Sequence, residues 1–420
     1  MSTISSIKGF ADLFPPESSR FTAIEAAARR VFGRYGYVEL RTPVLEHTEL
    51  FCRSIGEETD VVQKEMYTFP DRKQRLLTLR PEATAGVMRA YIASGLHDRE
   101  NVSKLFSLGP MFRYERPQKG RMRQFHQINC ECLGAHAPQT DAEVISMLMA
   151  FLREVGIADA LLQLNSLGCS ACRPAYRMLL KGYLRSLDAS VFCEDCRRRM
   201  ETNPLRVLDC KVVGCRAHTD GAPRIMEYHC PDCRAHFDCV LELLKELHIP
   251  FELHHRLVRG LDYYMRTTFE VVSGGIGAQS SIAGGGRYDG LSESLGGPHL
   301  PSIGFACGME RLALLLPAPE TKRPDFFVVC VVKEAHNTAL LLAEAMRARG
   351  LAGDMAHAGG SLKSQMRQAD KSGARFCCVL GPDELAAGAV VLKHMDTGEQ
   401  WILPQAEAIE RLTAQRDKAP

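Results

Sequence analysis

Apolar residues recur at helical spacing near the start of the chain. In residues 17–35 they fall three or four positions apart, and the pattern stops at Gly36, as is typical of an amphipathic helix and its end. Residues 37–43 then predict a strand that ends in Pro43. The ordered part of the chain is therefore expected to begin with a helix followed directly by a strand.

Two apolar runs further along enclose a basic turn. Residues 105–112 lead in and residues 125–133 lead out, with Pro117 and Gly120 at the reversal, so the pattern predicts a long antiparallel hairpin. The turn carries Arg113, Arg116, Lys119, Arg121 and Arg123. Arginine bonds phosphate oxygens bidentately and keeps its charge, which favours a nucleotide-binding face. Solvated basic turns are also common on protein surfaces, so this segment alone leaves both interpretations open.

A different pattern occupies the C-terminal part. Residues 325–332 predict a buried strand, 339–349 a helix, another helix follows, and 376–381 predict a second strand. Alternation of strand and helix is typical of a small α/β domain. Three basic residues recur every four positions and share one helical face, which is either a solvated surface or an RNA-binding surface. They are Lys363, Arg367 and Lys371.

Six glycines flank residues 280–283 between these regions, at positions 274, 275, 277, 284, 285 and 286. They indicate antiparallel strands whose backbones approach closely near a ligand. A phosphate-cradling loop is the rival interpretation. It is weak, because no Lys-Ser or Lys-Thr follows the glycines as a P-loop requires.

Composition sets broad limits on the function. The chain has 420 residues, 45% hydrophobic and 24% charged, as in globular proteins of two or three domains. It shows no run of about 18 apolar residues and no basic-then-apolar leader, so we expect neither a membrane span nor a secretory signal, and expect a cytoplasmic protein. Because the net charge is only +2, any nucleic-acid binding must come from local patches.

Sixteen cysteines in a long chain without a leader point to thiols or metal ligands rather than disulfides. Two Cys-x-x-Cys units have zinc-ligand spacing, and we expect them to close one structural zinc site together. Their cysteines are Cys193, Cys196, Cys230 and Cys233. A further unit at Cys169 and Cys172 is a weaker candidate. The alternative is that cysteine serves as a small buried apolar residue, as expected for Cys377 and Cys378.

Four segments together resemble one family of enzymes. Residues 112–127 are similar to the second signature of class II aminoacyl-tRNA synthetases, and residues 304–312 to the third. The string Arg259-Gly260-Leu261-Asp262-Tyr263-Tyr264 is similar to the histidine-specific segment of histidyl-tRNA synthetases, and residues 79–84 supply a fourth match. The resemblance covers nearly the whole chain. It departs from the family at Ala83, where glycine is usual, and in the many cysteines of the middle region.

The resemblance implies ATP-dependent attachment of L-histidine to tRNA(His). Histidine attacks the α-phosphate of ATP to give histidyl-adenylate and diphosphate, and the terminal ribose of the tRNA then takes the histidyl group and releases AMP. Both steps spread negative charge, so fixed positive charge is needed more than a nucleophile. By motif match, Arg113 holds the α-phosphate, Arg311 the γ-phosphate and Glu115 the adenine edge, with Mg²⁺ on the diphosphate. Arg259 bridges the histidine carboxylate and the α-phosphate, so it and Arg113 are the expected catalytic residues.

A histidine pocket is implied by the same family positions. It must meet an imidazole with one donor and one acceptor nitrogen, as well as the α-ammonium group. The implied residues are Glu82, Thr84 and Gln127 at the ammonium, Glu131 and Tyr264 at the imidazole, and Ala83, Arg113, Arg259 and Tyr263 around them. Because neighbours in a strand point to opposite sides, only one of Tyr263 and Tyr264 is expected to face the ligand fully.

The implied fold is α+β. A class II catalytic core, with an antiparallel sheet flanked by helices, is expected over residues 1–320. A cysteine-rich, mixed or helical insertion interrupts it at about 165–250, and a C-terminal α/β anticodon-binding domain covers 324–420. Residues 17–43 resemble the first class II signature, which builds the dimer interface, so a homodimer is implied.

Two rival functions share parts of this resemblance. One is the catalytically silent paralogue that regulates ATP phosphoribosyltransferase, which predicts lost motifs and no C-terminal domain. The other is a class II synthetase for a different amino acid, which gives no account of residues 259–264.

Overall fold

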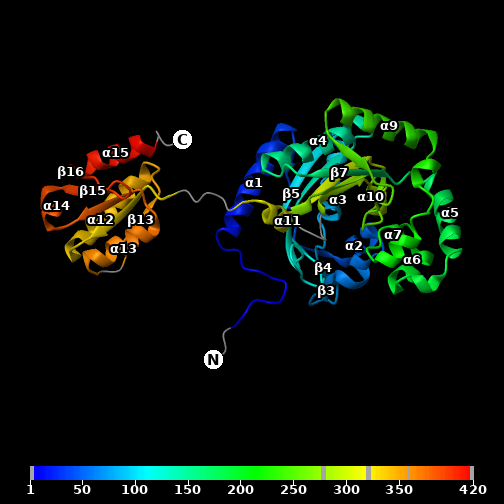
Figure 1. Cartoon of the computed structure of the whole chain (residues 1–420), viewed down its shortest axis with the longest axis horizontal. Helices are drawn as coiled ribbons and strands as arrows, with labels where there is room; N and C mark the ends of the chain where they lie inside the picture. Colours follow the sequence, from blue (N-terminus) through cyan, green and yellow to red (C-terminus); the bar gives the residue numbers. More distant parts are fainter. Residues whose placement is uncertain (1–3, 276–280, 318–322, 358–359, 417–420) are drawn as a thin grey trace. The chain divides into compact units, whose positions relative to one another are not determined.

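The chain folds into two compact units, Met1–Pro319 and Glu320–Pro420. The computed structural model describes residues 4–275, 281–317, 323–357 and 360–416. The first unit holds an eight-stranded and a three-stranded sheet, and the second unit a five-stranded sheet (Figure 1). Each unit also has its own buried core. Within these described ranges, no helix is long and apolar enough to cross a membrane.

An eight-stranded sheet forms the centre of the first unit. In spatial order its strands are β1 (Val38–Glu39), β5 (Ser103–Phe112), β6 (Gln124–Leu133), β11 (Ser302–Gly308), β10 (Ser281–Arg287), β9 (Met265–Val272), β7 (Leu161–Ser166) and β8 (Phe251–Leu253). Only the outer pairs, β1 with β5 and β7 with β8, are parallel. The predicted basic hairpin is confirmed as β5 and β6, with Gly120 at a φ of +72° in its turn.

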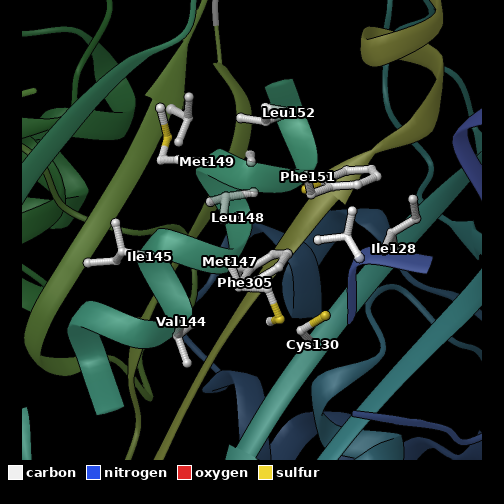
Figure 2. Packing of buried hydrophobic residues seen from close by; sticks show 14 of the residues in the cluster. Ile128, Cys130, Val144, Ile145, Met147, Leu148, Met149, Phe151, Leu152 and Phe305 are labelled. Carbon is white, nitrogen blue, oxygen red and sulfur yellow. The ribbon is translucent and has the colours of Figure 1, made fainter. Parts of the chain in front are cut away.

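Helices of the first unit bury one side of this sheet. They are α1 (Glu17–Arg34), α4 (Pro138–Glu154), α9 (Pro231–Glu246) and α11 (Met309–Leu315). Figure 2 shows the packing of α4 around Phe151 against Phe305 of β11. Phe32 of α1 packs against both, with its ring centroid 5.3 Å from that of Phe151 and 5.9 Å from that of Phe305. The helical spacing of residues 17–35 therefore becomes a face that packs on the sheet.

Smaller elements complete the first unit. A three-stranded sheet has the order β2 (Leu45–His47), β4 (Leu76–Leu79) and β3 (Tyr67–Pro70). The short helices of this part are α2 (Thr48–Ile55), the π-helix Val61–Glu65, α3 (Thr84–Ala93) and α10 (Leu291–Ser294). The connection between β7 and β8 holds α5 (Arg173–Arg185), α6 (Glu194–Thr202), α7 (Leu205–Leu208) and α8 (Val213–His218) before α9. Short 3-10 turns lie at Leu96–Asp98, Ala189–Val191 and Ile225–Tyr228 in the first unit and at Lys333–Ala335 in the second.

The second unit is a five-stranded mixed sheet with helices. Its order is β13 (Gly353–Met355), β12 (Phe326–Cys330), β14 (Phe376–Leu380), β15 (Ala389–His394) and β16 (Gln400–Pro404). The helices are α12 (His336–Ala348), α13 (Leu362–Ser372), α14 (Pro382–Ala387) and α15 (Gln405–Arg416). Because β13, β12 and β14 run parallel through helical crossovers, the predicted α/β domain is confirmed. Cys377 and Cys378 are fully buried in β14, as expected of small apolar residues.

Candidate active site

A cavity of about 720 Å³ lies in the first unit, lined by residues of β6, β9, β10 and β11 and of the loops around Arg113 and Arg259. Most of the predicted site residues meet in it. Those lining the cavity are Glu82, Thr84, Arg113, Glu115, Gln127, Arg259, Tyr263, Tyr264 and Arg311. Ala83 and Glu131 are not among its lining residues, and both are buried, with 0% and 2% of their surfaces exposed.

Backbone carbonyls fix two of the arginines. Arg113 donates from Nε to the carbonyl of Pro81 at 2.8 Å, and its guanidinium lies 5.5 Å from the ring centroid of Phe125. Arg311, on α11, donates to the carbonyls of Gly120 at 3.2 Å and Ser281 at 2.6 Å. Burial, and then the charge of Arg121, lower the pKa of Arg311, yet a guanidinium stays charged at neutral pH.

Arg259 faces the same cavity from the loop between β8 and β9. Its Nη1 lies 3.6 Å from Oε1 of Glu270, and its guanidinium lies 5.6 Å from the ring centroid of Tyr264. Burial lowers the pKa of Arg259, but Tyr264 and Glu270 outweigh that effect and raise it. Its buried Nε has no hydrogen-bond partner in the described part of the chain. The side chain is thus fully charged, and its Nε–H group can still donate a hydrogen bond to a ligand.

Gly284 of β10 makes room for this arginine. A Cβ at Gly284 would lie 2.5 Å from Cζ of Arg259 and closer still to Nη1. At Gly285 a Cβ would instead collide with the carbonyl oxygen of Gly304 on the neighbouring strand. The predicted close backbone approach is therefore confirmed, and at Gly284 the neighbour is a predicted catalytic side chain.

A chain of buried polar groups supports one wall of the cavity. Glu82 accepts hydrogen bonds from the backbone N–H groups of Thr84 at 2.7 Å and Ala85 at 2.8 Å, at the start of α3. The hydroxyl of Thr84 bonds Oε1 of Glu131 at 2.7 Å, and Tyr288 bonds Oε2. Burial raises the pKa of Glu131 to about 8, because its charged form is poorly solvated there. Both Glu131 oxygens already have protein partners behind the wall.

The expectation for the tyrosine pair is wrong. Tyr263 and Tyr264 do not lie in a strand, since β9 begins only at Met265. Both line the cavity, with ring centroids 4.6 Å apart. In a turn, successive side chains need not alternate between two faces, so both rings reach the same space. Arg173 of α5 bonds the carbonyl of Tyr264 and helps to fix this turn.

Asn129 is a cavity residue that the sequence motifs did not identify. It lines the cavity next to Gln127, and the side-chain carbonyl oxygens of both residues are buried without a hydrogen-bond partner in the described ranges. The signal was available, because Gln127, Asn129 and Glu131 alternate along β6 and must share one face.

Only part of the basic hairpin turn reaches the cavity. Arg113 and Arg121 line it, and Arg121 pairs with Glu115. Arg116 and Lys119 are exposed, and Arg123 lies 3.9 Å over the ring centroid of Tyr114. The turn therefore divides its charge between the cavity and the surface.

The cysteine pairing expected from the sequence is wrong. Cys193 and Cys196 do not share a site with Cys230 and Cys233. The sulfurs form two separate groups, Cys169, Cys172, Cys230 and Cys233 in one, and Cys193, Cys196, Cys210 and Cys215 in the other. The unit at Cys169 and Cys172, the weaker candidate by sequence, completes the first group.

In the second unit, the basic stripe lies on α13. Lys363, Arg367 and Lys371 are all exposed, while Gln365 and Ala369 of the same helix are buried. The stripe therefore faces solvent and is free to meet a large ligand.

Two family models match the chain. One, described as histidyl-tRNA synthetase, matches residues 9–183 and 203–312, and one described as an anticodon binding domain matches residues 325–415. The interval between the two parts of the first match holds Cys193 and Cys196.

Relatives are similar over almost the full length. A histidine–tRNA ligase of Nitratidesulfovibrio vulgaris is 66% identical over 414 residues, covering 99% of this chain and 99% of that protein. One of Oleidesulfovibrio alaskensis is 62% identical over 403 residues, covering 95% and 97%. The crystal structure of apo histidyl-tRNA synthetase from S. aureus has a TM-score of 0.82 at 34% identity and covers 98% of this chain and 100% of that one.

Proposed function

This chain belongs to the histidyl-tRNA synthetase family of ligases, and we propose that its cavity activates L-histidine with ATP and transfers the histidyl group to tRNA(His). One observation carries the proposal. The arginines expected at ATP and all but one of the polar residues expected at histidine line a single cavity of about 720 Å³, the exception being Glu131. Two substrates that must react with each other need such a shared space.

Electrostatic stabilisation supplies the catalysis. Arg113 and Arg259 flank the α-phosphate, where charge develops as the histidine carboxylate attacks, and Arg311 holds the γ-phosphate. Arg259 also meets the histidine carboxylate, so it aligns the nucleophile with the phosphorus. Glu115 accepts from the adenine amino group. No protein nucleophile is needed, because the substrate carboxylate attacks directly.

Mg²⁺ accompanies ATP as part of the substrate. This ion prefers oxygen ligands and is commonly held by phosphates together with one or two carboxylates. The cavity offers suitable carboxylates beside its arginines, at Glu270 and Glu310. When bound, the ion neutralises part of the charge on the diphosphate.

Histidine is selected by polar groups that an apolar side chain would leave unpaired. Glu82 and Gln127 meet the α-ammonium group, and Thr84 orients the wall between them. Tyr264 and Tyr263 enclose the imidazole. Glu131 influences the imidazole indirectly, from its buried position behind Thr84. Leaving such buried groups without partners is costly, so the pocket rejects apolar analogues of similar size.

Recognition of tRNA and assembly complete the proposal. The second unit binds the anticodon region, and Lys363, Arg367 and Lys371 contact its phosphates. Two copies pair near β1, an edge strand on which Val38 is 60% exposed. The homodimer acts in the cytoplasm, where charged tRNA is used.

Exchange of labelled diphosphate into ATP tests the proposal, with each of the twenty amino acids offered separately. Exchange with histidine alone supports it. Exchange with another amino acid would replace histidine as the substrate. No exchange in a folded, Mg²⁺-containing preparation would contradict activation and favour the silent regulatory paralogue.

A further inference from the structure

Eight cysteines of the first unit gather into two four-sulfur groups. The first cluster comprises Cys169, Cys172, Cys230 and Cys233, and the second cluster comprises Cys193, Cys196, Cys210 and Cys215. Within each cluster all four Sγ atoms lie within 4.8 Å of one another. Nothing in the reaction proposed above uses them.

The sulfur spacing distinguishes metal ligands from disulfides. In the first cluster Cys169 lies 3.7 Å from Cys172 and 3.8 Å from Cys230, and Cys172 lies 3.9 Å from Cys233, Sγ to Sγ. In the second cluster Cys193 and Cys210 are 3.9 Å apart. A zinc ion bound at about 2.3 Å by four thiolates sets its sulfurs about 3.8 Å apart, at the corners of a tetrahedron. A disulfide bond would need about 2.05 Å.

We propose that this chain binds two structural Zn²⁺ ions, one in each four-cysteine cluster. Four protein thiolates complete the coordination of zinc and leave no position for a substrate, so both ions serve the fold. Tetrathiolate ligation also selects zinc over Mg²⁺ and Ca²⁺, which prefer oxygen.

The backbone around both clusters suits thiolates. Cys172, Cys193 and Cys230 are the N-caps of α5, α6 and α9, and the positive end of a helix stabilises an anionic sulfur. Backbone N–H groups of Cys169 and Cys193 also donate to Cys172 and Cys215, each at 3.2 Å.

Gly168 is required for the first turn. It has a φ of +66°, and a Cβ there would lie 2.7 Å from Sγ of Cys172. A side chain at this position would therefore press on a ligand, in a backbone conformation that favours glycine.

The first ion would hold a wall of the active-site cavity. Directly after Cys172, Arg173 donates to the carbonyl of Leu167 at 3.2 Å and also bonds the carbonyl of Tyr264. Next to Cys230, the ring of His229 bonds the carbonyl of Ser166 at 3.1 Å. The cluster thus links α5 and α9 to the end of β7 and to the tyrosine turn.

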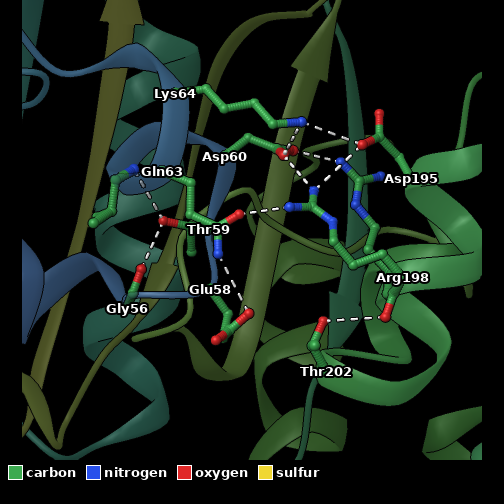
Figure 3. A network of polar contacts seen from close by, with 11 residues as sticks. Gly56, Glu58, Thr59, Asp60, Gln63, Lys64, Asp195, Arg198 and Thr202 are labelled. Atoms are coloured by element: carbon green, nitrogen blue, oxygen red, sulfur yellow. Dashed lines mark hydrogen bonds and ion pairs between the residues drawn. The ribbon is translucent and has the colours of Figure 1, made fainter.

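The second ion would anchor α6 on the catalytic core. Figure 3 shows Arg198 of α6 beside Asp60, with Nη2 to Oδ1 at 3.1 Å, and Lys64 beside Asp195 at 3.4 Å. Arg199 also pairs with Asp60. Although burial raises the pKa of Asp60, the two arginines outweigh it and lower that pKa, so the network is ionic. It reaches the π-helix that ends at Glu65, a residue of the cavity lining.

A buried arginine bonds both ends of the segment that carries Cys210 and Cys215 of the second cluster. Arg256 is 6% exposed and donates to the carbonyls of Leu208 at 3.4 Å and Arg216 at 3.1 Å. These two carbonyls lie on either side of Cys210 and Cys215 in sequence. The loop is thus held at its base by hydrogen bonds, and a metal ion would tie its ligands together.

Metal analysis of the purified full chain tests the proposal without reference to catalysis. We expect inductively coupled plasma mass spectrometry to find two zinc ions per chain. Cys169→Ser with Cys172→Ser should leave one zinc, and so should Cys193→Ser with Cys196→Ser. The matched control is Cys239→Ser, which alters a half-buried cysteine of α9 outside both clusters and should keep two. A double variant that keeps both ions would overturn the assignment of its cluster.

Wild-type protein gives a second test if a variant does not fold. Titration with a mercurial should release two zinc ions as eight thiolates react, and the apo chain should take up two Co²⁺ ions with the visible spectrum of tetrahedral thiolate coordination. Iron in place of zinc would overturn the identity of the metal. Disulfides between these cysteines, or a reduced chain that takes up neither Zn²⁺ nor Co²⁺, would overturn the sites themselves.

Discussion

Replacing Gly284 with alanine should disable catalysis while leaving the fold intact. The added Cβ would lie 2.5 Å from Cζ of Arg259, whereas ordinary contacts begin at 3.4 Å. Nη1 would lie closer still, at 2.3 Å, so the guanidinium must move by about 1.1 Å, since it is the end of a flexible side chain and the β10 backbone is fixed on both sides. A displacement near 1 Å of a positioning group costs about 100-fold in rate, or roughly 2.7 kcal/mol of transition-state stabilisation.

The assay is histidine-dependent exchange of diphosphate into ATP, alongside thermal unfolding. We expect exchange by Gly284→Ala to fall about 100-fold with little change in Tm. The matched control is Gly33→Ala, at an exposed position of α1 where a Cβ meets nothing within 4 Å. It should exchange normally and gain up to about 1 kcal/mol of stability, because alanine favours a helix more than glycine does.

A double-variant cycle decides whether the effect passes through Arg259. If it does, Gly284→Ala should cause no further loss in a chain that already carries Arg259→His. Independent, multiplicative losses would mean that the alanine acts through another group. Undiminished exchange by Gly284→Ala alone would refute the role given to Arg259 in its present position.

Three further predictions concern charge. Arg259→His should lower exchange by about 100-fold or more with an unchanged Tm, and near-normal exchange would remove Arg259 from the mechanism. Glu131→Gln should flatten the pH dependence of stability. In the wild type the pKa of Glu131 is about 8 in the folded state and about 4.3 in the unfolded state, so the free energy of unfolding falls as pH rises between these two values. Denaturant titrations should therefore show the variant gaining stability relative to the wild type as pH rises toward 9. Parallel pH profiles of the two proteins would contradict this. The triple substitution of Lys363, Arg367 and Lys371 by alanine should weaken tRNA binding and leave exchange unaffected. The slope of the logarithm of the binding constant against the logarithm of the salt concentration should fall in magnitude by up to about three. An unchanged slope would mean that the stripe is only a solvated surface.

Local patterns in the sequence predicted much of the fold. The helix α1, the basic hairpin and the strand–helix alternation of the second unit are confirmed because each is specified by its own apolar periodicity and turn residues. Most of the site residues named by motif match do line the cavity, although they are a minority of its lining. Their mutual geometry had to come from the structure, since the carbonyls that hold Arg113 and Arg311 carry no sequence signal.

The failures have a common physical cause. A Cys-x-x-Cys unit fixes which two sulfurs lie close, but tertiary packing decides which units meet, and here α9 brings Cys230 to Cys169 across the end of β7. The tyrosine pair was misread because a short apolar string does not show where a strand begins. Glu131 lies on the same face of β6 as Gln127 and Asn129. The alternation of side chains along the strand predicts this face, but not that Glu131 is buried behind Thr84.

The way in which the cavity holds its arginines bears on how it acts. Surface arginines of this chain commonly pair with carboxylates, as Arg185 does with Glu201. By contrast, Arg113 and Arg311 donate their hydrogen bonds to neutral backbone carbonyls. The carboxylates beside Arg113 and Arg259 lie further off, with Glu115 at 4.0 Å and Glu270 at 3.6 Å. A carbonyl fixes a guanidinium without cancelling its charge, whereas a carboxylate at contact distance would compete with a phosphate. Positive charge is therefore in place before ATP binds and needs little reorganisation as the transition state forms, which is the condition under which fixed charge contributes most to rate.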